Sequence, residues 1–446
     1  MSQGVSGVQV QRGALGTWGA CSARYGREAP VSDAKSVEPR SGVGVSHPVL
    51  SAPVVDGSGL PGRGVRKDHR GFQGSSGALT SGPWGGTALD GALLRSLFSS
   101  TVPGTVGFEE ELLVVHRGSW MPADAAGVVA GVGDLRVKPE LPACQLEIAT
   151  SVHEDVAGAV DELRSCRALV AAACGSDLAV IATPVHPLLD GPTALSSTER
   201  AAGLGARYRE IIGRQLVSSL QVHLAFGDAD CTLGVYHALR DLLPELAALA
   251  GAAPFAAGRD TGLCSVRPVI ASQLPRQGVP PIINSWEQFA EDLAWMVRGG
   301  AVADASEWWW ELRPHLRYGT LELRVLDVQA TTDQTSAIAR LVHALATRLA
   351  EQHLLGELQP PAPTWRIAEN RWSALRDGVR GELLDLHTGE PYPTHRRLHD
   401  LINTAEPYAP DGLDDVRALV ERPPVDHLRA LGPERVVPWL AEVFTV

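Results

Sequence analysis

The chain has 446 residues, of which 44% are hydrophobic and 20% charged, a composition typical of a soluble globular protein. Its net charge of -12 at pH 7 argues against nucleic acid or an anionic membrane surface as the main partner. Only three basic residues are lysines (Lys35, Lys67 and Lys138), so a P-loop with its Gly-Lys-Ser/Thr run is excluded. Any clamp for phosphate or carboxylate groups must then be built from arginine.

The cysteine and hydropathy patterns predict a cytoplasmic protein. The six cysteines form no C-x-x-C pair and no cluster with histidine at zinc spacing, which is typical of scattered reduced thiols. No apolar run approaches the roughly 20 residues that span a bilayer, and the N-terminus lacks the hydrophobic segment of a secretory signal. We therefore expect no membrane partner, and the sequence leaves open whether the chain forms a homo-oligomer.

The chain divides into three regions by composition. Residues 1–100 are dense in Gly, Ser and Pro and predict a disordered extension, with a docking arm as the alternative. A short helix near residues 89–98 is expected to precede the first strand. Residues 101–355 predict a catalytic α+β core. Residues 356–446 predict a helical region packed on that core.

Strands and helices mix in the core without a regular βα repeat. No G-x-G-x-x-G follows a predicted strand, which disfavours a Rossmann domain. We expect strands at 105–115, 145–149, 178–183, 219–226 and 319–327. We expect helices at 153–174, 208–216, 233–250 and 334–350, and then at 365–378, 395–403 and 414–421.

Four of the predicted strands concentrate ionisable or amide side chains on one face. Residues two apart on a strand share a face. The polar faces are Glu109/Glu111, Gln145/Glu147, Gln221/His223 and Glu322/Arg324, while Glu110 shares the opposite face with Phe108 and Leu112. Ordinary half-buried strands with a solvent-facing side are the alternative, but such sides usually carry Thr, Ser, Lys or Gln.

The acidic residues of these faces suit a cation. Two carboxylates at positions i and i+2 repel each other unless a cation lies between them. Mg²⁺ commonly takes one or two protein carboxylates and fills its other positions with water and phosphate oxygens. The four strands together could therefore hold two or three Mg²⁺ ions around a nucleoside triphosphate. From the first strand alone, solvated carboxylates are an equally good interpretation.

Several motifs, taken in order, resemble those of the glutamate–cysteine ligase type 2 family, also called carboxylate–amine ligases. The motifs are 107–114 (GFEEELLV), 145–150 (QLEIAT), 221–223 (QVH), 258–262 (GRDTG), 309–314 (WWELRP), 318–325 (YGTLELRV) and 369–372 (ENRW). The similarity covers about residues 104–385. It implies a fold related to glutamine synthetase, an antiparallel sheet with helices packed on one face and the site on its concave face.

The resemblance also implies an activity. Members use ATP to phosphorylate the side-chain carboxylate of glutamate, and an amine such as cysteine then displaces phosphate to form an amide. Positioning and charge neutralisation do most of the work in such phosphoryl transfer. The implied cofactors are ATP and Mg²⁺, the implied partners are small molecules (amino acid, amine and ATP), and the implied role is thiol biosynthesis of the glutathione type.

The resemblance assigns roles to individual residues. Arg324 and Glu322 would be catalytic, with Arg324 meeting the transferring phosphate. The metal ligands would be Glu109, Glu111, Glu147, His223 and Glu322. The candidates for binding the amino-acid carboxylate are Arg259, Arg267 and Arg313, and for each of them a structural role near a turn is equally compatible. The tryptophan run at 308–310 is better interpreted as packing than as a substrate platform.

The sequence departs from the family pattern at Gln221, where members commonly have His. An amide is a poor magnesium ligand beside carboxylates, which puts one auxiliary contact in doubt. Two alternatives stay open, namely the same ligase chemistry with another amine in specialised metabolism, because no motif marks the acceptor pocket, and a catalytically silent sensor of nucleotides or amino acids. The intact set of ionisable residues argues against the sensor. An ATP-grasp ligase is disfavoured because its nucleotide site relies on lysines that this chain lacks.

Overall fold

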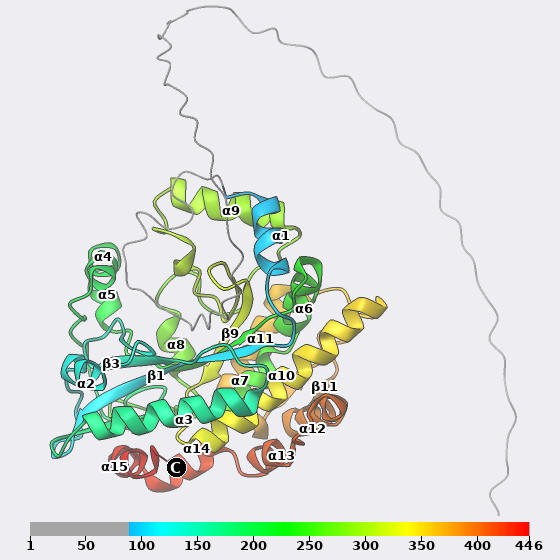
Figure 1. Ribbon diagram of the computed structural model, residues 1–446. Coiled ribbons are helices and arrows are strands. Elements are labelled where there is room, and N and C mark those ends of the chain that lie inside the picture. The colour runs from blue at the N-terminus through cyan, green and yellow to red at the C-terminus, as the bar shows by residue number, and fades with distance from the viewer. Residues whose placement is uncertain (1–88, 446) are drawn as a thin grey trace, which may run out of the picture. The chain divides into compact units, whose positions relative to one another are not determined.

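The computed structural model describes residues 89–445, which are coloured in Figure 1. They fold around one large sheet and two small hairpins. The strands are β1 (Val106–His116), β2 (Val137–Pro139), β3 (Gln145–Ala149), β4 (Leu178–Ile181), β5 (Ser219–Leu224), β6 (Phe255–Ala256), β7 (Arg259–Asp260), β8 (Leu312–His315), β9 (Thr320–Asp327), β10 (Glu382–Leu384) and β11 (Pro391–Pro393).

The large sheet has the order β2-β3-β1-β5-β9-β8, and β4 pairs with the last part of β1. Every strand pair in it is antiparallel. This confirms the predicted α+β fold with an antiparallel sheet. Strands β2 and β8 were not predicted, because each is short and contains a proline, which weakens the strand signal in a sequence.

Helices lie on both sides of the sheet. They are α1 (Gly91–Ser99), α2 (Ala126–Val132), α3 (Val156–Ala173), α4 (Glu199–Tyr208), α5 (Glu210–Gly213), α6 (Ala229–Asp241), α7 (Leu243–Ala250), α8 (Arg267–Ala271), α9 (Trp286–Arg298), α10 (Thr332–Leu355), α11 (Thr364–Asp377), α12 (Thr394–Ala405), α13 (Asp414–Glu421), α14 (Pro424–Leu431) and α15 (Pro433–Val443). Short 3₁₀ turns lie at Ala305–Glu307, Gly378–Arg380 and Glu406–Tyr408.

The two long helices α3 and α10 run along one face of the sheet (Figure 1). Their apolar sides meet those of the strands in one large hydrophobic core, which also receives residues from the later helices α11 to α13. Each begins at a side-chain cap, Asp155 for α3 and a capping box of Thr331 and Gln334 for α10. Burial of this face leaves the opposite face of the strands for polar side chains.

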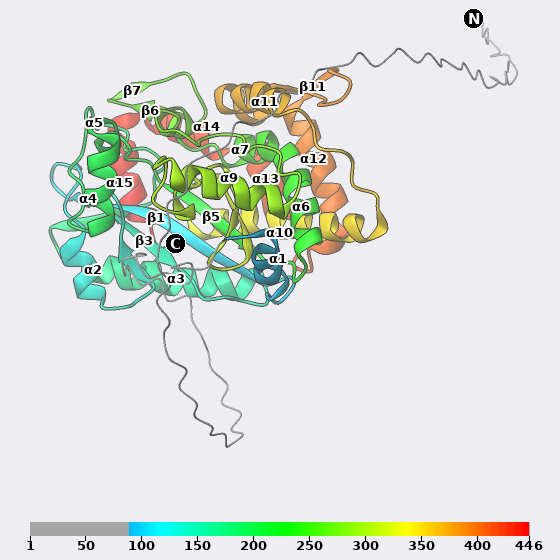
Figure 2. The same cartoon turned by 90° about the horizontal axis from the view of Figure 1, so that it is seen from above.

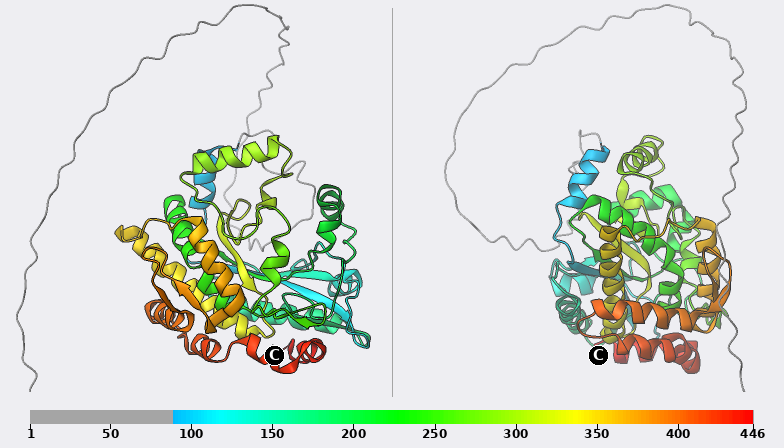
Figure 3. Two further views of the ribbon diagram at one scale, coloured as in Figure 1. Left: turned by 180° about the vertical axis from the view of Figure 1, so that it is seen from behind. Right: turned by 90° about the vertical axis from the view of Figure 1, so that its right-hand side faces the viewer.

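Other helices lie on the opposite side of the sheet (Figure 1). Helices α4, α5, α8 and α9 stand there (Figures 1 and 3). Seen from above, α4 and α5 lie at one end of the sheet, and α1 and α6 lie at the other (Figure 2). These elements border the face that carries the predicted polar residues.

Two predicted helices differ from the structure for local reasons. The single helix expected at 233–250 is two helices, α6 and α7, separated at Leu242. Pro244 in the first turn of α7 has no N–H to continue the hydrogen bonds of α6. The helix expected at 208–216 is replaced by α4 and α5, which lie mostly before it and meet at Arg209, a residue with φ of 56°.

The end of the extension expected at residues 1–100 also differs. Residues 1–88 of that extension lie outside the described residues. The remainder contains α1, in which Leu94 and Phe98 are fully buried. The Phe98 ring stacks on Trp286 of α9 with the ring centroids 4.4 Å apart. The short helix expected near residues 89–98 therefore belongs to the folded region.

None of the helices between residues 89 and 445 combines the length and apolar character that crossing a membrane requires. The five cysteines in this part of the chain are buried and form no disulfide. The cytoplasmic location stays a prediction, as do the partners and the oligomeric state.

Candidate active site

The sheet register brings the predicted polar side chains onto one face. Residues directly paired on antiparallel strands point to the same side of the sheet. The register pairs Glu147 with Glu111, Glu109 with Gln221, His223 with Glu322, and Glu322 with Arg313. Strands β3, β1, β5, β9 and β8 thus contribute these side chains to one face, which we call the acidic face.

The acidic face has a clear limit along β1. Leu113 and Val115 have the same parity as Glu109, but both are fully buried in a second hydrophobic cluster with residues of α15. Glu110, which has the opposite parity, lies on the helical side, where Arg167 of α3 donates hydrogen bonds to both of its carboxylate oxygens. Alternation along the strand therefore separates a structural glutamate from those of the acidic face.

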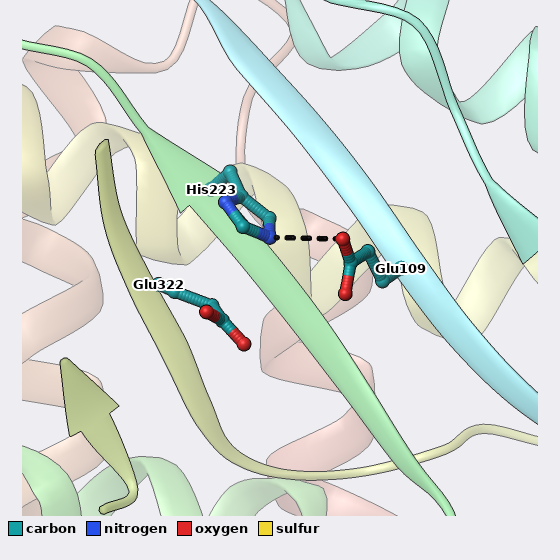
Figure 4. A group of neighbouring side chains, drawn as sticks. All are labelled: Glu109, His223 and Glu322. Atoms are coloured by element: carbon teal, nitrogen blue, oxygen red, sulfur yellow. Dashed lines mark ion pairs between the residues drawn. The ribbon is translucent and has the colours of Figure 1, made fainter. Parts of the chain in front are cut away.

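Three residues of the acidic face come close enough to share one cation. One ligand atom each from Glu109, His223 and Glu322 lies within 4.8 Å of the other two. The three side chains come from adjacent strands, as Figure 4 shows, and His223 Nε2 lies 3.6 Å from Glu109 Oε1. The other ring nitrogen, Nδ1, lies 2.9 Å from Thr320 Oγ1, which fixes the orientation of the ring.

Electrostatics keep two of these groups ionised. Burial alone would raise the pKa of Glu322, but Arg313 and Arg324 beside it hold that pKa well below its usual range. Burial likewise acts to raise the pKa of Glu109, and the adjacent His223 ring outweighs it and lowers the pKa to about 2. Both carboxylates therefore carry their negative charge at neutral pH, as binding of a hard cation requires.

Glu322 is held by two arginines. Arg313 donates to both carboxylate oxygens, over 2.6 Å from Nε and 3.1 Å from a terminal nitrogen. Arg324, two residues along the same strand, also donates to Glu322. Arg313, a predicted contact of the substrate carboxylate, thus uses its guanidinium on Glu322 and on the carbonyls of Ser306 and Trp308.

Glu111 and Glu147 have different surroundings. Burial raises the pKa of each to about 7. Glu111 accepts hydrogen bonds from the Ser219 N–H at 2.7 Å and from Gln221 Nε2 at 2.9 Å. Glu147 accepts one from Lys138 Nζ at 2.9 Å. The two carboxylates therefore face protein donors, and neither joins the cluster of Glu109, His223 and Glu322.

Gln221 connects Glu111 with Arg324. Its amide nitrogen donates to Glu111, and its amide oxygen accepts a hydrogen bond from Arg324 over 2.5 Å. The register of β5 with β9 shifts at Gln221, so that Arg324 and Val325 together lie opposite it. Such an irregularity re-aims a side chain. The residue that departs from the family pattern is therefore a bridge between a carboxylate and a guanidinium.

A cavity of about 110 Å³ adjoins this end of the acidic face. Glu111 and Arg324 contribute to its wall, together with charged, amide and apolar residues from β3, α4, α8 and the segments around them. These further lining residues include Glu140, Gln145, Arg200, Gln215, Leu274 and Trp309. Within the predicted packing run, Trp308 is buried in the core whereas Trp309 lines this cavity.

The remaining predicted arginines lie in two different environments. Arg267 lines the cavity, but its Nε donates to Asp327 over 2.6 Å and a terminal nitrogen donates to the Val325 carbonyl over 2.6 Å. Arg259 lies exposed on the small hairpin of β6 and β7, outside the cavity lining. The structure thus gives Arg267 a clear structural role and does not bring Arg259 to the acidic face.

Sequence reasoning missed several residues of the site. His315 on β8 has the parity of Arg313, and its ring lies 5.3 Å from the His223 ring and stacks on Tyr318 at 4.4 Å. Burial lowers the pKa of His315 to about 3, so the ring is neutral. Recognition of β8 as a strand would have revealed this parity. Lys138 lies on β2, a strand that was likewise not predicted.

The 309–314 and 369–372 motifs meet in an ion pair. Arg371 of α11 donates to both carboxylate oxygens of Glu311, over 2.6 and 2.5 Å. The Glu311 carbonyl in turn accepts the backbone N–H of Arg324 at 2.7 Å. Glu311 also lines the cavity. A helix of the C-terminal region therefore supports the strand that carries Arg324 and Glu322.

Comparison with known protein families identifies the class of protein to which this fold and its acidic face belong. The sequence model of glutamate-cysteine ligase family 2 matches residues 105–423. The chain therefore belongs to this family and is a ligase.

Relatives and solved structures agree with the assignment. A protein of Jannaschia sp. (strain CCS1), provisionally named glutamate–cysteine ligase 2, is 32% identical over 314 residues, covering 68% of this chain and 82% of that protein. A similarly named protein of Mycolicibacterium vanbaalenii is 32% identical over 309 residues, covering 68% and 84%.

Among solved structures, a glutamate–cysteine ligase from Francisella tularensis superposes with a TM-score of 0.57 at 16% identity, covering 76% of this chain and 88% of that one. A bifunctional glutathione synthetase from Pasteurella multocida gives a TM-score of 0.56 at 15% identity, covering 79% and 53%. At these identities the likeness concerns the fold.

Proposed function

We propose that the protein is an ATP- and Mg²⁺-dependent ligase that joins the γ-carboxylate of glutamate to an amine, with cysteine as the first candidate. The observation that carries the proposal is the cluster of Glu109, His223 and Glu322 beside Arg324. The similar Francisella tularensis enzyme was solved in complex with AMP, which supports a nucleotide site. The family assignment supports glutamate and cysteine as substrates.

The donor set of Glu109, His223 and Glu322 fits a divalent cation. Two ionised carboxylates and one imidazole form a set that Mn²⁺ accepts readily and Mg²⁺ accepts with water completing its shell. A bound divalent cation would neutralise charge on the phosphate oxygens. Thr320, through its contact with His223 Nδ1, would keep the Nε2 atom directed at the cation.

The reaction would run in two steps. A carboxylate oxygen of the donor attacks the γ-phosphorus of ATP, the bond to the bridging oxygen breaks, and ADP leaves. The amine nitrogen then attacks the acyl carbon, the bond to the phosphate oxygen breaks, and the nitrogen loses its proton to the departing phosphate. Arg324 would stabilise the charge on the transferring phosphoryl group, because it lies at the junction of the acidic face and the cavity.

The cavity is the proposed site of the amino acid. Of the arginines near it, Arg267 and Arg313 already bind Asp327 and Glu322. Arg200 lines the cavity, is more than half exposed, and donates to the two Glu140 oxygens over long distances of 3.3 and 3.5 Å. Arg200 is therefore better placed than Arg259, Arg267 or Arg313 to receive a substrate carboxylate.

The test is ADP release from ATP over a panel of amino acids and amines, with mass detection of products. We expect ADP release to require glutamate, and hydroxylamine to trap a hydroxamate when the amine is omitted. Pyrophosphate as a product would indicate adenylation and refute the acyl phosphate. ADP release that ignores every amino acid would indicate a plain ATPase, and no turnover with tight nucleotide binding would favour the sensor. The panel also decides between cysteine and another amine.

A further inference from the structure

Lys138 is the only lysine among the described residues, and it lies on the acidic face. Strand β2 pairs Lys138 directly with Glu147, and β3 pairs Glu147 directly with Glu111. The three side chains therefore form a row across neighbouring strands. The ammonium group lies 2.9 Å from Glu147 Oε1, and both side chains are largely shielded, with 22% and 14% of their surfaces exposed.

The acidic face thus has two halves that differ in kind. In one half, Glu109, His223 and Glu322 bring one ligand atom each within 4.8 Å of the others, while Glu322 is also held by Arg313 and Arg324. In the other half, both Glu111 oxygens accept from Ser219 and Gln221, and Glu147 is paired with an ammonium group. No second group of three potential ligands comes together within residues 89–445.

The fixed charges of the acidic face also favour one divalent cation over two. The face carries four carboxylates, on Glu109, Glu111, Glu147 and Glu322, and three permanent cations, on Lys138, Arg313 and Arg324. One divalent cation at the first half would leave the face with a net positive charge, ready for a polyphosphate. A second divalent cation beside Glu147 would have to approach an ammonium group in a shielded site, where like charges repel strongly.

We propose that Lys138 takes the place of a second divalent cation. Its ammonium neutralises Glu147 with one N–H and donates the others to an anionic oxygen of the bound phosphate, so that the site needs a divalent cation only at Glu109, His223 and Glu322. An ammonium has three donors, and the structure gives it one carboxylate partner, which leaves two for a ligand. The inference rests on the proposed function, and it removes Glu111 and Glu147 from the predicted metal ligands.

The test counts bound Mn²⁺, a paramagnetic substitute for Mg²⁺, by electron paramagnetic resonance of the full-length protein without nucleotide. We expect one Mn²⁺ per chain for the wild type and for Lys138→Arg. We expect two for Lys138→Met, because Glu147 is then released to bind a cation. Glu109→Gln should lose the one site of the wild type. Arg376→Met, which removes a positive charge from an exposed pair with Asp377, is the matched control and should still bind one.

Turnover supplies a second measurement. At low Mg²⁺, Lys138→Met should release ADP roughly a hundredfold more slowly, the usual effect of removing one donor to a developing anion. High Mg²⁺ should restore much of this rate, because a second cation can enter. Lys138→Arg should need no such rescue.

The outcomes separate this inference from the proposed function. Two or more Mn²⁺ per wild-type chain would overturn the role of Lys138 and leave the ligase proposal intact, even if Lys138→Met failed to fold. One Mn²⁺ in both the wild type and Lys138→Met, without rescue by Mg²⁺, would also overturn it. A wild type that binds no Mn²⁺ and releases no ADP would refute both.

Discussion

Two neighbouring glutamates on β1 should respond differently to the loss of their charge. We expect Glu109→Gln to lower the catalytic rate and Glu110→Gln to lower the stability of the fold. Glu109 belongs to the acidic face, whereas Glu110 is fully buried against α3. Arg167, also fully buried, donates to both oxygens of Glu110 at 2.8 and 2.7 Å. It also donates to the carbonyls of Gln329, Ala330 and Phe444, so this one side chain ties β1 to the start of α10 and the end of the described chain.

Replacement Glu110→Gln leaves a buried guanidinium without its counter-charge. Removing one partner of a buried ion pair costs about 3–5 kcal/mol. The Gln oxygen can still accept one hydrogen bond and three carbonyls remain, so we expect the lower end, about 3 kcal/mol. For a chain of this size, with an unfolding entropy of roughly 2.1 cal/mol/K per residue, that corresponds to a fall in Tm of about 3–4 °C. Glu109→Gln should lower Tm less than Glu110→Gln, because the partner that Glu109 loses is the His223 ring at 3.6 Å and not a fully buried guanidinium that donates to both oxygens.

The assay pairs thermal unfolding with ADP release at a temperature where both variants are folded. Glu109→Gln should lose about a hundredfold or more in rate, as expected for a carboxylate that holds a cation at the transferring phosphate. Glu110→Gln should keep most of its rate. If folded Glu110→Gln lost as much activity as Glu109→Gln, or if its Tm matched that of the wild type, the assignment of the two faces of β1 would be refuted.

Three further changes test other parts of the site. Glu322→Gln should abolish ADP release in a protein that still binds nucleotide. Arg324→Lys should lose about tenfold or more in steady-state rate, because the planar guanidinium, one nitrogen of which donates to both Glu322 and Gln221, is lost. Arg371→Lys breaks the ion pair in which both Glu311 oxygens accept from the guanidinium. It should lower kcat as well as Tm, whereas loss of a purely structural pair would lower Tm alone. For His237, burial and the nearby Arg240 lower the pKa to about 4 in the folded protein, against about 6.5 unfolded. The contribution of the neutral ring to the free energy of unfolding is therefore fully present above about pH 6.5. As pH falls toward 4 this contribution is lost, which lowers the free energy of unfolding by roughly 1–2 kcal/mol after allowance for partial solvation. Denaturant unfolding of His237→Gln should lack this loss, and an unchanged pH dependence would contradict it.

The sequence was sufficient to predict which face each strand residue occupies, because alternation is a local property of the backbone. It separated Glu109 from Glu110 without any knowledge of their neighbours. It could not identify the partners, since Arg167 lies 57 residues from Glu110 and Arg371 lies 60 residues from Glu311. Partner choice depends on how helices pack across the sheet, which no local pattern encodes.

The same limitation explains why the sequence pointed to Arg259, Arg267 and Arg313 as carboxylate-binding residues and did not single out Arg200. An arginine near a turn has the same sequence pattern whether it binds a substrate or a carbonyl, and only packing separates Arg200 at the cavity from Arg267 on Asp327. Lys138 was noted only for the rarity of its residue type. Its relation to Glu147 depends on β2, a strand of three residues that ends in a proline and gives little signal.

The contact between Glu311 and Arg371 bears on how the chain should be divided. The prediction separated a catalytic region at 101–355 from a helical region at 356–446. Arg371 belongs to the second region, yet it binds both oxygens of a cavity residue whose carbonyl holds the backbone of Arg324. The large core likewise contains residues of both regions. The boundary at residue 355 marks a change in composition, and we propose that the catalytic unit extends at least to α11.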